Sequence, residues 1–383
     1  MPARLIDSFA TTGALADQFS DAAVLDAMLR FETALATAQA RLGMIPQRAA
    51  DAIAKVHRVD PASMAEEARA SATLVIPFVK ALTKRVRQID AEAADFVHWG
   101  TTSQDVLDTA LVLLLAGART ILIQDHVRLE AMVRTLSDQH AETVMLARTL
   151  LQPALPTTFG YKAAGWYGAI HRSWRRLSKS FDEALQLQFG GAAGTLASYG
   201  SRGIELAVEL GKELDLPVPS APWHTHRDRL ASLVANCGIY AGSLAKIARD
   251  ITLLMQPEIG EASERGGGSS AMPNKRNPAG SVVALAAAAR LPGLVASFLA
   301  SMPQEHERAA GGWQSEWPTV ADAIQATGST LAAVVSALDG LTVDPARMRA
   351  NLGACGKAKD LNCPEQYLGA AESFRQRLLE DAE

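Results

Sequence analysis

The sequence predicts an all-α fold in which long helices form a bundle. Hydrophobic residues make up 48% of the 383 residues and charged residues 20%, which is enough apolar material for a large core. Aromatic residues account for only 5%, and alanine, the strongest helix former, is abundant. Proline breaks helix interiors and is absent from 78–152, 157–216 and 223–256. No alternating strand pattern stands out, so we expect no sheet.

The first long helix is predicted between a capping residue, Asp21, and a stop formed by Gly43 and Pro46. Its apolar residues recur at alternating spacings of four and three and form one stripe: Val24, Met28, Phe31, Leu35, Ala38 and Leu42. A helix of this kind packs one face against a core.

A second helix is predicted from Asp105 to about His140, with a length of roughly 50 Å. Its centre is apolar nearly all round, so it should be buried on several sides. Further helices are expected at 160–187, 228–256, 278–300 and 318–339. The apolar faces of these helices are too wide for one neighbouring helix to cover, which indicates a bundle completed by other subunits. The periodicity fits a monomeric bundle equally well.

Composition excludes several function classes. The net charge is −4 and the pI is near 6.1, and no basic stripe suggests nucleic acid. Cys237, Cys355 and Cys363 match no metal spacing and are expected to be reduced thiols. The segment 1–10 has no signal-peptide pattern, and no uncharged apolar run reaches the ~18 residues of a membrane helix. We therefore expect a soluble, cytoplasmic protein.

The Gly-rich segment 259–280 interrupts the helical pattern and carries the strongest chemical signal. Its part 268–278 contains two serines, a lysine, an arginine and two asparagines, and three consecutive glycines at 266–268 make the chain adaptable. Such a loop can close over an anion, stabilise developing negative charge and let a serine exchange a proton with carbon. On composition alone, a flexible linker with solvated charges remains an alternative.

The residues 268–278 read GSSAMPNKRNP and resemble the GSSxMPxKxNP fingerprint of the fumarase/aspartase superfamily at every fixed position. The resemblance implies an all-α fold with long helices in a tetrameric bundle. It also implies that Ser269 and Lys275 are catalytic. The substrate-binding residues implied by this motif are Ser270, Met272 and Asn277.

A second segment, 98–105, reads HWGTTSQD and resembles the superfamily's GxTSxD region. Thr102, Ser103 and Asp105 also suit the cap of the long helix, whose N-terminal N–H groups suit a carboxylate. An ordinary helix cap is the alternative. By resemblance Thr102 and Ser103 bind substrate carboxylates, and His98 is a further candidate because it directly precedes this loop.

A third segment, 148–160, resembles the superfamily's TxxQxAxPxTxG region and contributes Arg148 and Gln152 as candidates. Adenylosuccinate and argininosuccinate lyases carry a histidine two residues before the glutamine, as the general acid. This chain has Leu150 there, which cannot donate a proton. Those two activities are therefore disfavoured.

Three more strings resemble the bacterial 3-carboxy-cis,cis-muconate cycloisomerases. They are QFGGAAGTL at 188–196, PWHTHRDRL at 222–230 and MPQEHER at 302–308. They add Arg227, Arg229, His306 and Arg308 as candidate cations for a substrate with three carboxylates. His224 and His226 have no third ligand nearby, so we expect no metal.

The resemblance implies that a carboxylate of the substrate adds to its own double bond, giving 4-carboxymuconolactone in protocatechuate breakdown. Proximity would supply much of the catalysis, Ser269 would deliver the proton, and no cofactor would be required. Two alternatives remain open. One is a fumarate-releasing lyase of the same superfamily, and the other is a non-catalytic homologue that binds an acidic metabolite.

The resemblance runs almost continuously to about residue 351. We expect an N-terminal helical domain at 1–104, a central long-helix domain at 105–350 and a shortened remnant of the C-terminal domain at 351–383. By resemblance, each active site is shared by three subunits of a homotetramer.

Overall fold

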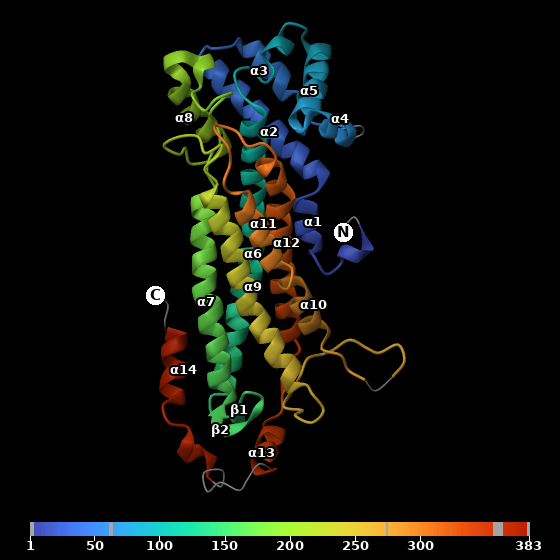
Figure 1. Ribbon diagram of the computed structural model, residues 1–383, viewed down its shortest axis with the longest axis vertical. Coiled ribbons are helices and arrows are strands. Elements are labelled where there is room, and N and C mark those ends of the chain that lie inside the picture. Colours follow the sequence, from blue (N-terminus) through green and yellow to red (C-terminus); the bar gives the residue numbers. More distant parts are fainter. Residues whose placement is uncertain (1–3, 61–63, 273–274, 355–362, 381–383) are drawn as a thin grey trace.

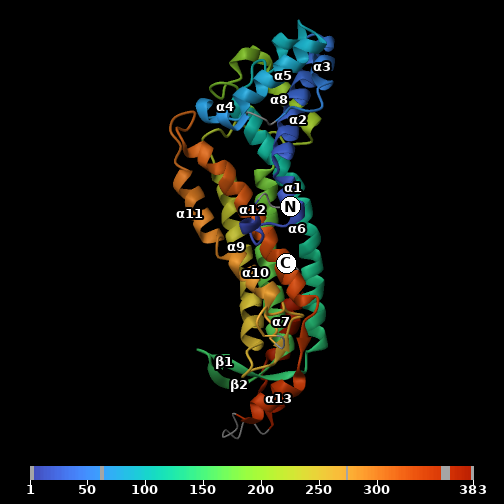
Figure 2. The same ribbon diagram turned by 90° about the vertical axis from the view of Figure 1, so that its right-hand side faces the viewer.

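The structure is a computed structural model and describes residues 4–60, 64–272, 275–354 and 363–380. It is an elongated helical bundle with smaller helices gathered at one end (Figure 1). A view at right angles shows the same long bundle from its side (Figure 2). The expectation of an all-α fold with long central helices is confirmed.

The bundle consists of long helices that run up and down its length, with α10 and α11 following one another in the same direction (Figure 1). They are α6 (Ser103–Gln139), α7 (Phe159–Ala184), α9 (Asp228–Leu254), α10 (Ala279–Ala288), α11 (Leu291–Ser301) and α12 (Gly312–Leu338). Helix α6 packs on α7, α7 on α9, α9 on α10, and α12 on α6, α9, α10 and α11. The core is therefore one continuous set of apolar side chains along the bundle.

The end of the bundle where α6 begins carries the small helices. These are α2 (Asp21–Arg41), α3 (Gln47–Ala54), α4 (Met64–Ser71), α5 (Val75–Ile89), η2 (Ala93–Phe96), η3 (Ala197–Arg202) and α8 (Gly203–Leu214). The first two elements, η1 (Leu5–Asp7) and α1 (Gly13–Gln18), lie instead beside the middle of the bundle, where α1 contacts α6 and α12 (Figure 1). The predicted first helix is confirmed as α2. Its cap is Ser20, whose hydroxyl accepts a hydrogen bond from the Ala23 N–H at 3.3 Å.

The opposite end carries strands that the sequence did not predict. β1 (Val144–Thr149) pairs antiparallel with β2 (Gln152–Thr158), and β3 (Ala262–Ser263) pairs with β4 (Thr342–Val343). The expectation of no sheet was wrong here. Pro153 and Pro156 hide the pattern of β2, and they are tolerated because the hairpin has only one partner for each strand. The segments α13 (Pro345–Ala354), η5 (Pro364–Tyr367) and α14 (Ala371–Glu380) complete this end.

Two helix boundaries differ from the expectation. The predicted helix 278–300 is divided into α10 and α11, and Pro292 stands in the first turn of α11, where its missing N–H costs nothing. Helix α12 begins at Gly312 and contains Pro318. The start of α12 is fixed by two buried side chains: the Trp313 indole N–H donates to Asp108, and Glu316 pairs with Arg227. The sequence placed the start of this helix at Pro318, but tertiary contacts extend it back to Gly312.

Three helical segments are long and apolar enough, by length and composition alone, to cross a membrane. They are Ser103–Gln139, Asp228–Leu254 and Ala279–Ser301, and the bundle buries 61%, 50% and 22% of their most apolar windows. Each contains charged residues, which is why a search for uncharged runs missed them. The first two are core helices of the bundle, whereas most of the third remains exposed. Of the cysteines, Cys237 and Cys363 are free, and Cys355 lies outside the described residues.

Glycine substitutions in α7 test how tightly it packs on the end of α6. A Cβ at Gly160 would lie 2.6 Å from both the Ala141 Cα and the Ser137 carbonyl oxygen, which are backbone atoms. Gly160→Ala should therefore reduce the free energy of unfolding by about 1–3 kcal/mol. Gly165→Ala is the matched control, because a Cβ there meets nothing within 4 Å, and it should stabilise by about 0.5–1 kcal/mol. Chemical denaturation followed by circular dichroism measures both, and equal effects would contradict the packing.

Candidate functional site

The predicted site residues lie in two groups at opposite ends of the bundle (Figure 1). The group where α6 begins contains His98, Thr102, Ser103, Arg227, Arg229, His306 and Arg308. The group beside the β1–β2 hairpin contains Arg148, Gln152, Ser269, Ser270, Met272, Lys275 and Asn277. Helix α6 has 37 residues, so roughly 55 Å of helix separates its two ends. One chain therefore does not bring the two groups together.

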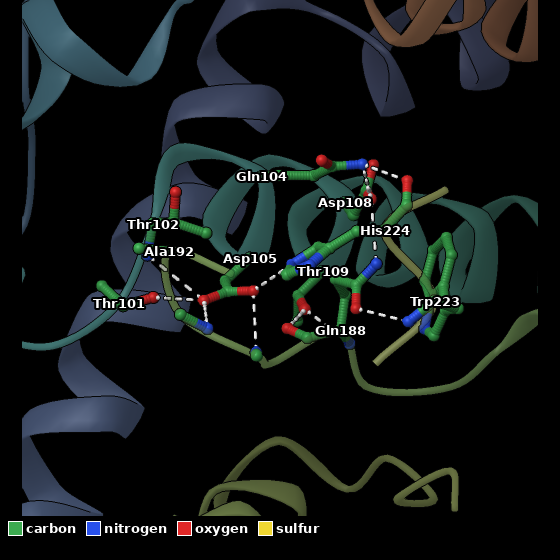
Figure 3. Close-up of polar contacts among 12 residues, drawn as sticks. Thr101, Thr102, Gln104, Asp105, Asp108, Thr109, Gln188, Ala192, Trp223 and His224 are labelled. Carbon is green, nitrogen blue, oxygen red and sulfur yellow. Dashed lines mark hydrogen bonds and ion pairs between the residues drawn. The ribbon is translucent and has the colours of Figure 1, made fainter. Parts of the chain in front are cut away.

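Asp105 organises the group at the start of α6 (Figure 3). Its buried carboxylate accepts hydrogen bonds from the backbone N–H groups of Gly190 and Gly191 at 2.9 and 2.8 Å. It also contacts the His224 ring at 2.8 Å and accepts from the Thr102 N–H at 3.2 Å. The predicted capping role of Asp105 is confirmed. The same carboxylate also holds three segments distant in sequence against one another, which places the Thr102 loop beside residues 190–194, the glycine segment of the QFGGAAGTL string.

Arg227 does not line an open site, contrary to the sequence expectation. Its guanidinium donates to both oxygens of Asp108 at 2.7 and 3.0 Å and to Glu316 at 2.9 and 2.7 Å. It also lies over the Trp223 ring, 4.6 Å from the centroid. All three charged side chains are fully enclosed. Because its N–H groups are engaged, Arg227 is a structural residue that joins helices rather than a substrate ligand.

Two carboxylates share the one guanidinium, and this perturbs Glu316. Burial raises the pKa of Glu316 to about 7, and repulsion from Asp108 adds to the rise while the attraction of Arg227 opposes it. The Gln304 amide donates to the same carboxylate at 2.5 Å. Gln304 belongs to the segment that carries His306 and Arg308, so the buried cluster also positions that segment.

His98 forms a histidine–carboxylate pair. Its Nδ1 lies 2.6 Å from the Glu32 carboxylate, and Glu32 is only 2% exposed. Burial lowers the pKa of His98, but the charge of Glu32 and its hydrogen bond outweigh burial, so the pKa is raised overall. The backbone of His98 is left-handed, with φ 59°. The pair thus holds a cation-forming ring at the entrance to the Thr102 loop.

Of the remaining cations of this group, Arg308 contacts the 190–194 glycine segment. Arg308 donates to the Ala192 carbonyl at 2.9 Å and, more weakly, to the Gly191 carbonyl at 3.4 Å. His306 is exposed, and Arg229 is half-buried in the first turn of α9. The MPQEHER and QFGGAAGTL strings therefore meet in space, as two parts of one site would.

At the far end, Arg148 is paired with a carboxylate. It binds Glu261 through two hydrogen bonds of 2.9 and 2.8 Å, and Glu261 also accepts from Asn351 at 2.7 Å. Beyond Arg148 the hairpin turns through Leu150 and Leu151, which are left-handed and 96% and 75% exposed. Both leucines adopt this strained conformation and present apolar side chains to solvent. Gln152 follows in β2 and is exposed.

The serine loop is closed at its base. Gly267 and Asn277 exchange two backbone hydrogen bonds of 2.9 Å, and the Asn277 side chain donates to the Gly268 carbonyl at 3.2 Å. The Ser269 hydroxyl oxygen accepts from the N–H groups of Ala271 and Met272 at 3.3 and 3.1 Å. Two donors aimed at this oxygen favour its ionised form. Ser270 and Lys275 are exposed, and residues 273–274 lie outside the described residues.

Sequence reasoning missed Glu32 and His224. Glu32 is a charged residue in the middle of an apolar helix, which is a usable signal because such residues are rarely buried without a partner. His224 was weighed only as a metal ligand, yet it is buried against Asp105. Within the described part of the chain, no group of three histidine, cysteine or acidic side chains is arranged to hold a metal ion.

Comparison with known proteins agrees with this arrangement. The model of a family described as lyase matches residues 9–293. The chain belongs to the fumarase/aspartase superfamily. It is 47% identical over 91% of its length to a 3-carboxy-cis,cis-muconate cycloisomerase of Bradyrhizobium diazoefficiens, and covers 79% of that protein. It is 42% identical over 88% of its length to a nitrosuccinate lyase of Streptomyces davaonensis, and covers 74% of that protein.

A solved structure of this superfamily has the same fold. The crystal structure of 3-carboxy-cis,cis-muconate lactonizing enzyme from Pseudomonas putida matches with a TM-score of 0.91 and 36% identity. The match covers 99% of this chain and 98% of that one. The expected domain boundaries and the shortening of the C-terminal domain stay predictions.

The raised pKa of Glu316 predicts a pH dependence of stability. A carboxyl group whose folded pKa is about 7 against an ordinary value of 4.5 binds more protons when folded, so the folded state loses stability as pH rises between these values. Glu316→Gln removes this titration. The stability of the wild type relative to the variant should fall, by at most about 1.4 kcal/mol per pH unit, from about pH 5 to pH 7. Parallel denaturation midpoints across that range would contradict the assignment.

Proposed function

We propose that this protein is a 3-carboxy-cis,cis-muconate cycloisomerase, which converts its substrate to 4-carboxymuconolactone. The proposal depends chiefly on one observation, the serine loop, in which two backbone N–H groups donate to the Ser269 oxygen. Identity of 47% and 43% to cycloisomerases of Bradyrhizobium diazoefficiens and Pseudomonas putida supports it.

The chemistry requires little covalent participation by the enzyme. A carboxylate of the substrate attacks its own carbon–carbon double bond, a C–O bond forms, and the electron pair moves toward the neighbouring carboxylate-bearing carbon. Holding the two ends together supplies much of the rate. The enolate-like charge would be stabilised by Lys275, Asn277 and the loop N–H groups, and Ser269 would then protonate carbon. The substrate supplies the nucleophile, so we expect no cofactor.

The substrate would carry three carboxylates, which need cations and hydrogen-bond donors. At the α6 end, Arg229, His306, Arg308 and His98 would supply positive charge, and Thr102 and Ser103 would donate hydroxyl hydrogen bonds. At the hairpin end, Gln152, Ser270 and Met272 would complete the surface around Ser269. Arg148 would contribute through its position on the β1–β2 hairpin, although its charge is already balanced by Glu261.

We further propose that the active site is shared by three subunits of a soluble, cytoplasmic homotetramer. The two groups of site residues lie at opposite ends of one chain, and antiparallel packing of two copies would place one end of each bundle against the other end of its neighbour. An apolar surface for this contact is available on α10 and α11, where Val282 and Leu299 are 51% and 48% exposed. Burial of such a surface favours association.

A second candidate is a lyase that cleaves a C–N bond to release fumarate. Its support is the 42% identity to the nitrosuccinate lyase and the serine loop common to the superfamily. Leu150 weighs against the subclass that uses a histidine on the hairpin. A steady-state screen with adenylosuccinate, argininosuccinate, aspartate, malate and nitrosuccinate separates the two candidates.

Replacing the proposed proton donor tests the mechanism. Ser269→Ala should lower kcat by roughly 10²–10⁴, because general acid catalysis typically contributes that much, while circular dichroism remains unchanged. Turnover is followed as loss of the ultraviolet absorbance of the conjugated diene. Ser243→Ala, an exposed serine of α9, is the control and should retain full activity. Near-normal turnover by Ser269→Ala would remove Ser269 from the mechanism.

Replacing an apolar residue of α11 tests the shared site. Leu299→Glu should dissociate the tetramer, since a buried, unpaired carboxylate is costly, and should abolish activity with the fold intact. Ile204→Glu on α8 is the control, because Ile204 is 78% exposed and distant from α11. Light scattering reports the mass. A wild-type protein that is a fully active monomer would rule out the shared site.

A further inference from the structure

A cavity of about 520 Å³ lies beneath the β1–β2 hairpin, between the first turns of α7 and the last turns of α9. Leucines from the hairpin and from α9 form much of its wall, including Leu146, Leu151 and Leu254. Ionisable side chains also line it: Arg148, Lys162, Lys246 and Asp250. An apolar cavity with a few convergent charges is the usual form of a small-molecule site.

The charges around the cavity do not balance. Each carboxylate already has its own cation: Glu261 binds Arg148, and Asp250 binds Lys246. Asp250 also accepts from the Trp166 indole N–H at 2.8 Å, and Glu261 accepts from Asn351. Lys162 is the remaining cation, and its ammonium group has no hydrogen bond or ion pair with any residue in the described ranges.

The environment of Lys162 disfavours its charge when the cavity holds no anion. Burial lowers the pKa of Lys162 below its ordinary value, and nearby Asp250 opposes this effect while Lys246 and Arg148 add to it. A half-buried, unpaired ammonium group costs free energy that a carboxylate in the cavity would recover. Stability alone gives no reason for a lysine at this position, since methionine would fill the same space without a charge.

We propose that Lys162 binds a carboxylate of the substrate in the cavity beneath the hairpin, and is a binding residue of the active site. This inference rests on the proposed function, whose substrate carries three carboxylates on an apolar diene. The leucine wall suits the carbon skeleton, and the ammonium group supplies a charge-assisted hydrogen bond. The cavity adjoins the hairpin that carries Gln152, at the same end of the bundle as the serine loop.

Three variants test the proposal by kinetics. Lys162→Met removes the charge and keeps the length, Lys162→Arg keeps the charge, and Lys179→Met is the matched control on the same helix, where the lysine side chain is 78% exposed. Lys162→Met should raise KM about tenfold to a hundredfold, the usual weight of a hydrogen bond to a charged group. Lys162→Arg should have a KM close to that of the wild type, and Lys179→Met should match the wild type.

A pH profile separates binding from a structural role. In the wild type KM should rise as pH increases through the lowered pKa of Lys162, because the ammonium group then loses its charge. Lys162→Arg should show no such rise, since arginine stays protonated. Lys162→Met should melt no lower than the wild type. An unchanged KM in Lys162→Met, or a rise in KM accompanied by a large loss of melting temperature, would overturn the proposal.

Calorimetric binding of propane-1,2,3-tricarboxylate distinguishes failure of this inference from failure of the proposed function. If the wild type binds this probe and Lys162→Met binds it at least tenfold more weakly, the carboxylate site stands even when the muconate is not turned over. If the wild type turns over the muconate, and the wild type and Lys162→Met bind the probe equally, the proposed function is supported and the proposed role of Lys162 is wrong. Absence of both binding and turnover in the wild type overturns both.

Discussion

The ion pairs of Arg227 are the interaction on which the arrangement of the bundle depends. Asp108 lies in the first turns of α6, Arg227 caps α9, and Glu316 lies in the first turns of α12, so one guanidinium joins the starts of three helices. Because all three groups are excluded from water, loss of Arg227 would leave two buried carboxylates without a cation, which is far more costly than loss of a surface pair. This constraint sets where each helix begins relative to the others. The segments between the helices then follow, because Asp105 and Gln304 attach the glycine segment and the 302–311 segment to the same framework.

Because α6, α9 and α12 begin at the same end of the bundle, the segments that follow them lie together at the opposite end. The up-and-down order of α6, α7 and α9 therefore places the Thr102 loop at one end and both the hairpin and the serine loop at the opposite end. This separation gives a physical reason for an enzyme of this fold to act as an assembly. The exposed apolar surface of α10 and α11 supports the proposed assembly, because antiparallel neighbours that covered it would bring unlike ends together.

The two ends differ in how their charges are balanced. At the α6 end, Asp105 contacts His224, and Arg227 pairs with Asp108 and Glu316, so these buried charged groups are satisfied within the chain and maintain its shape. Beside the hairpin, Lys162 has no hydrogen bond or ion pair with any residue that the structure describes, and Lys275 is exposed. Unbalanced positive charge next to apolar walls suits a polyanionic ligand with a hydrocarbon core.

Local pattern was sufficient for the long helices, the cap of α6 and the serine loop, because each is encoded by residues close together in the sequence. The stripe of α2 and the GSSAMPNKRNP string could be interpreted without knowing what lay nearby. The hairpin was missed because its prolines mask the alternation and only pairing of β1 with β2 reveals it. The same limit explains the error at Arg227. The RDR string predicts a substrate ligand, whereas the structure buries Arg227 between Asp108 and Glu316, which are 119 and 89 residues away in the sequence. Whether a charge is satisfied or left for a ligand, as at Lys162, depends on groups distant in sequence, and only the tertiary structure brings these together.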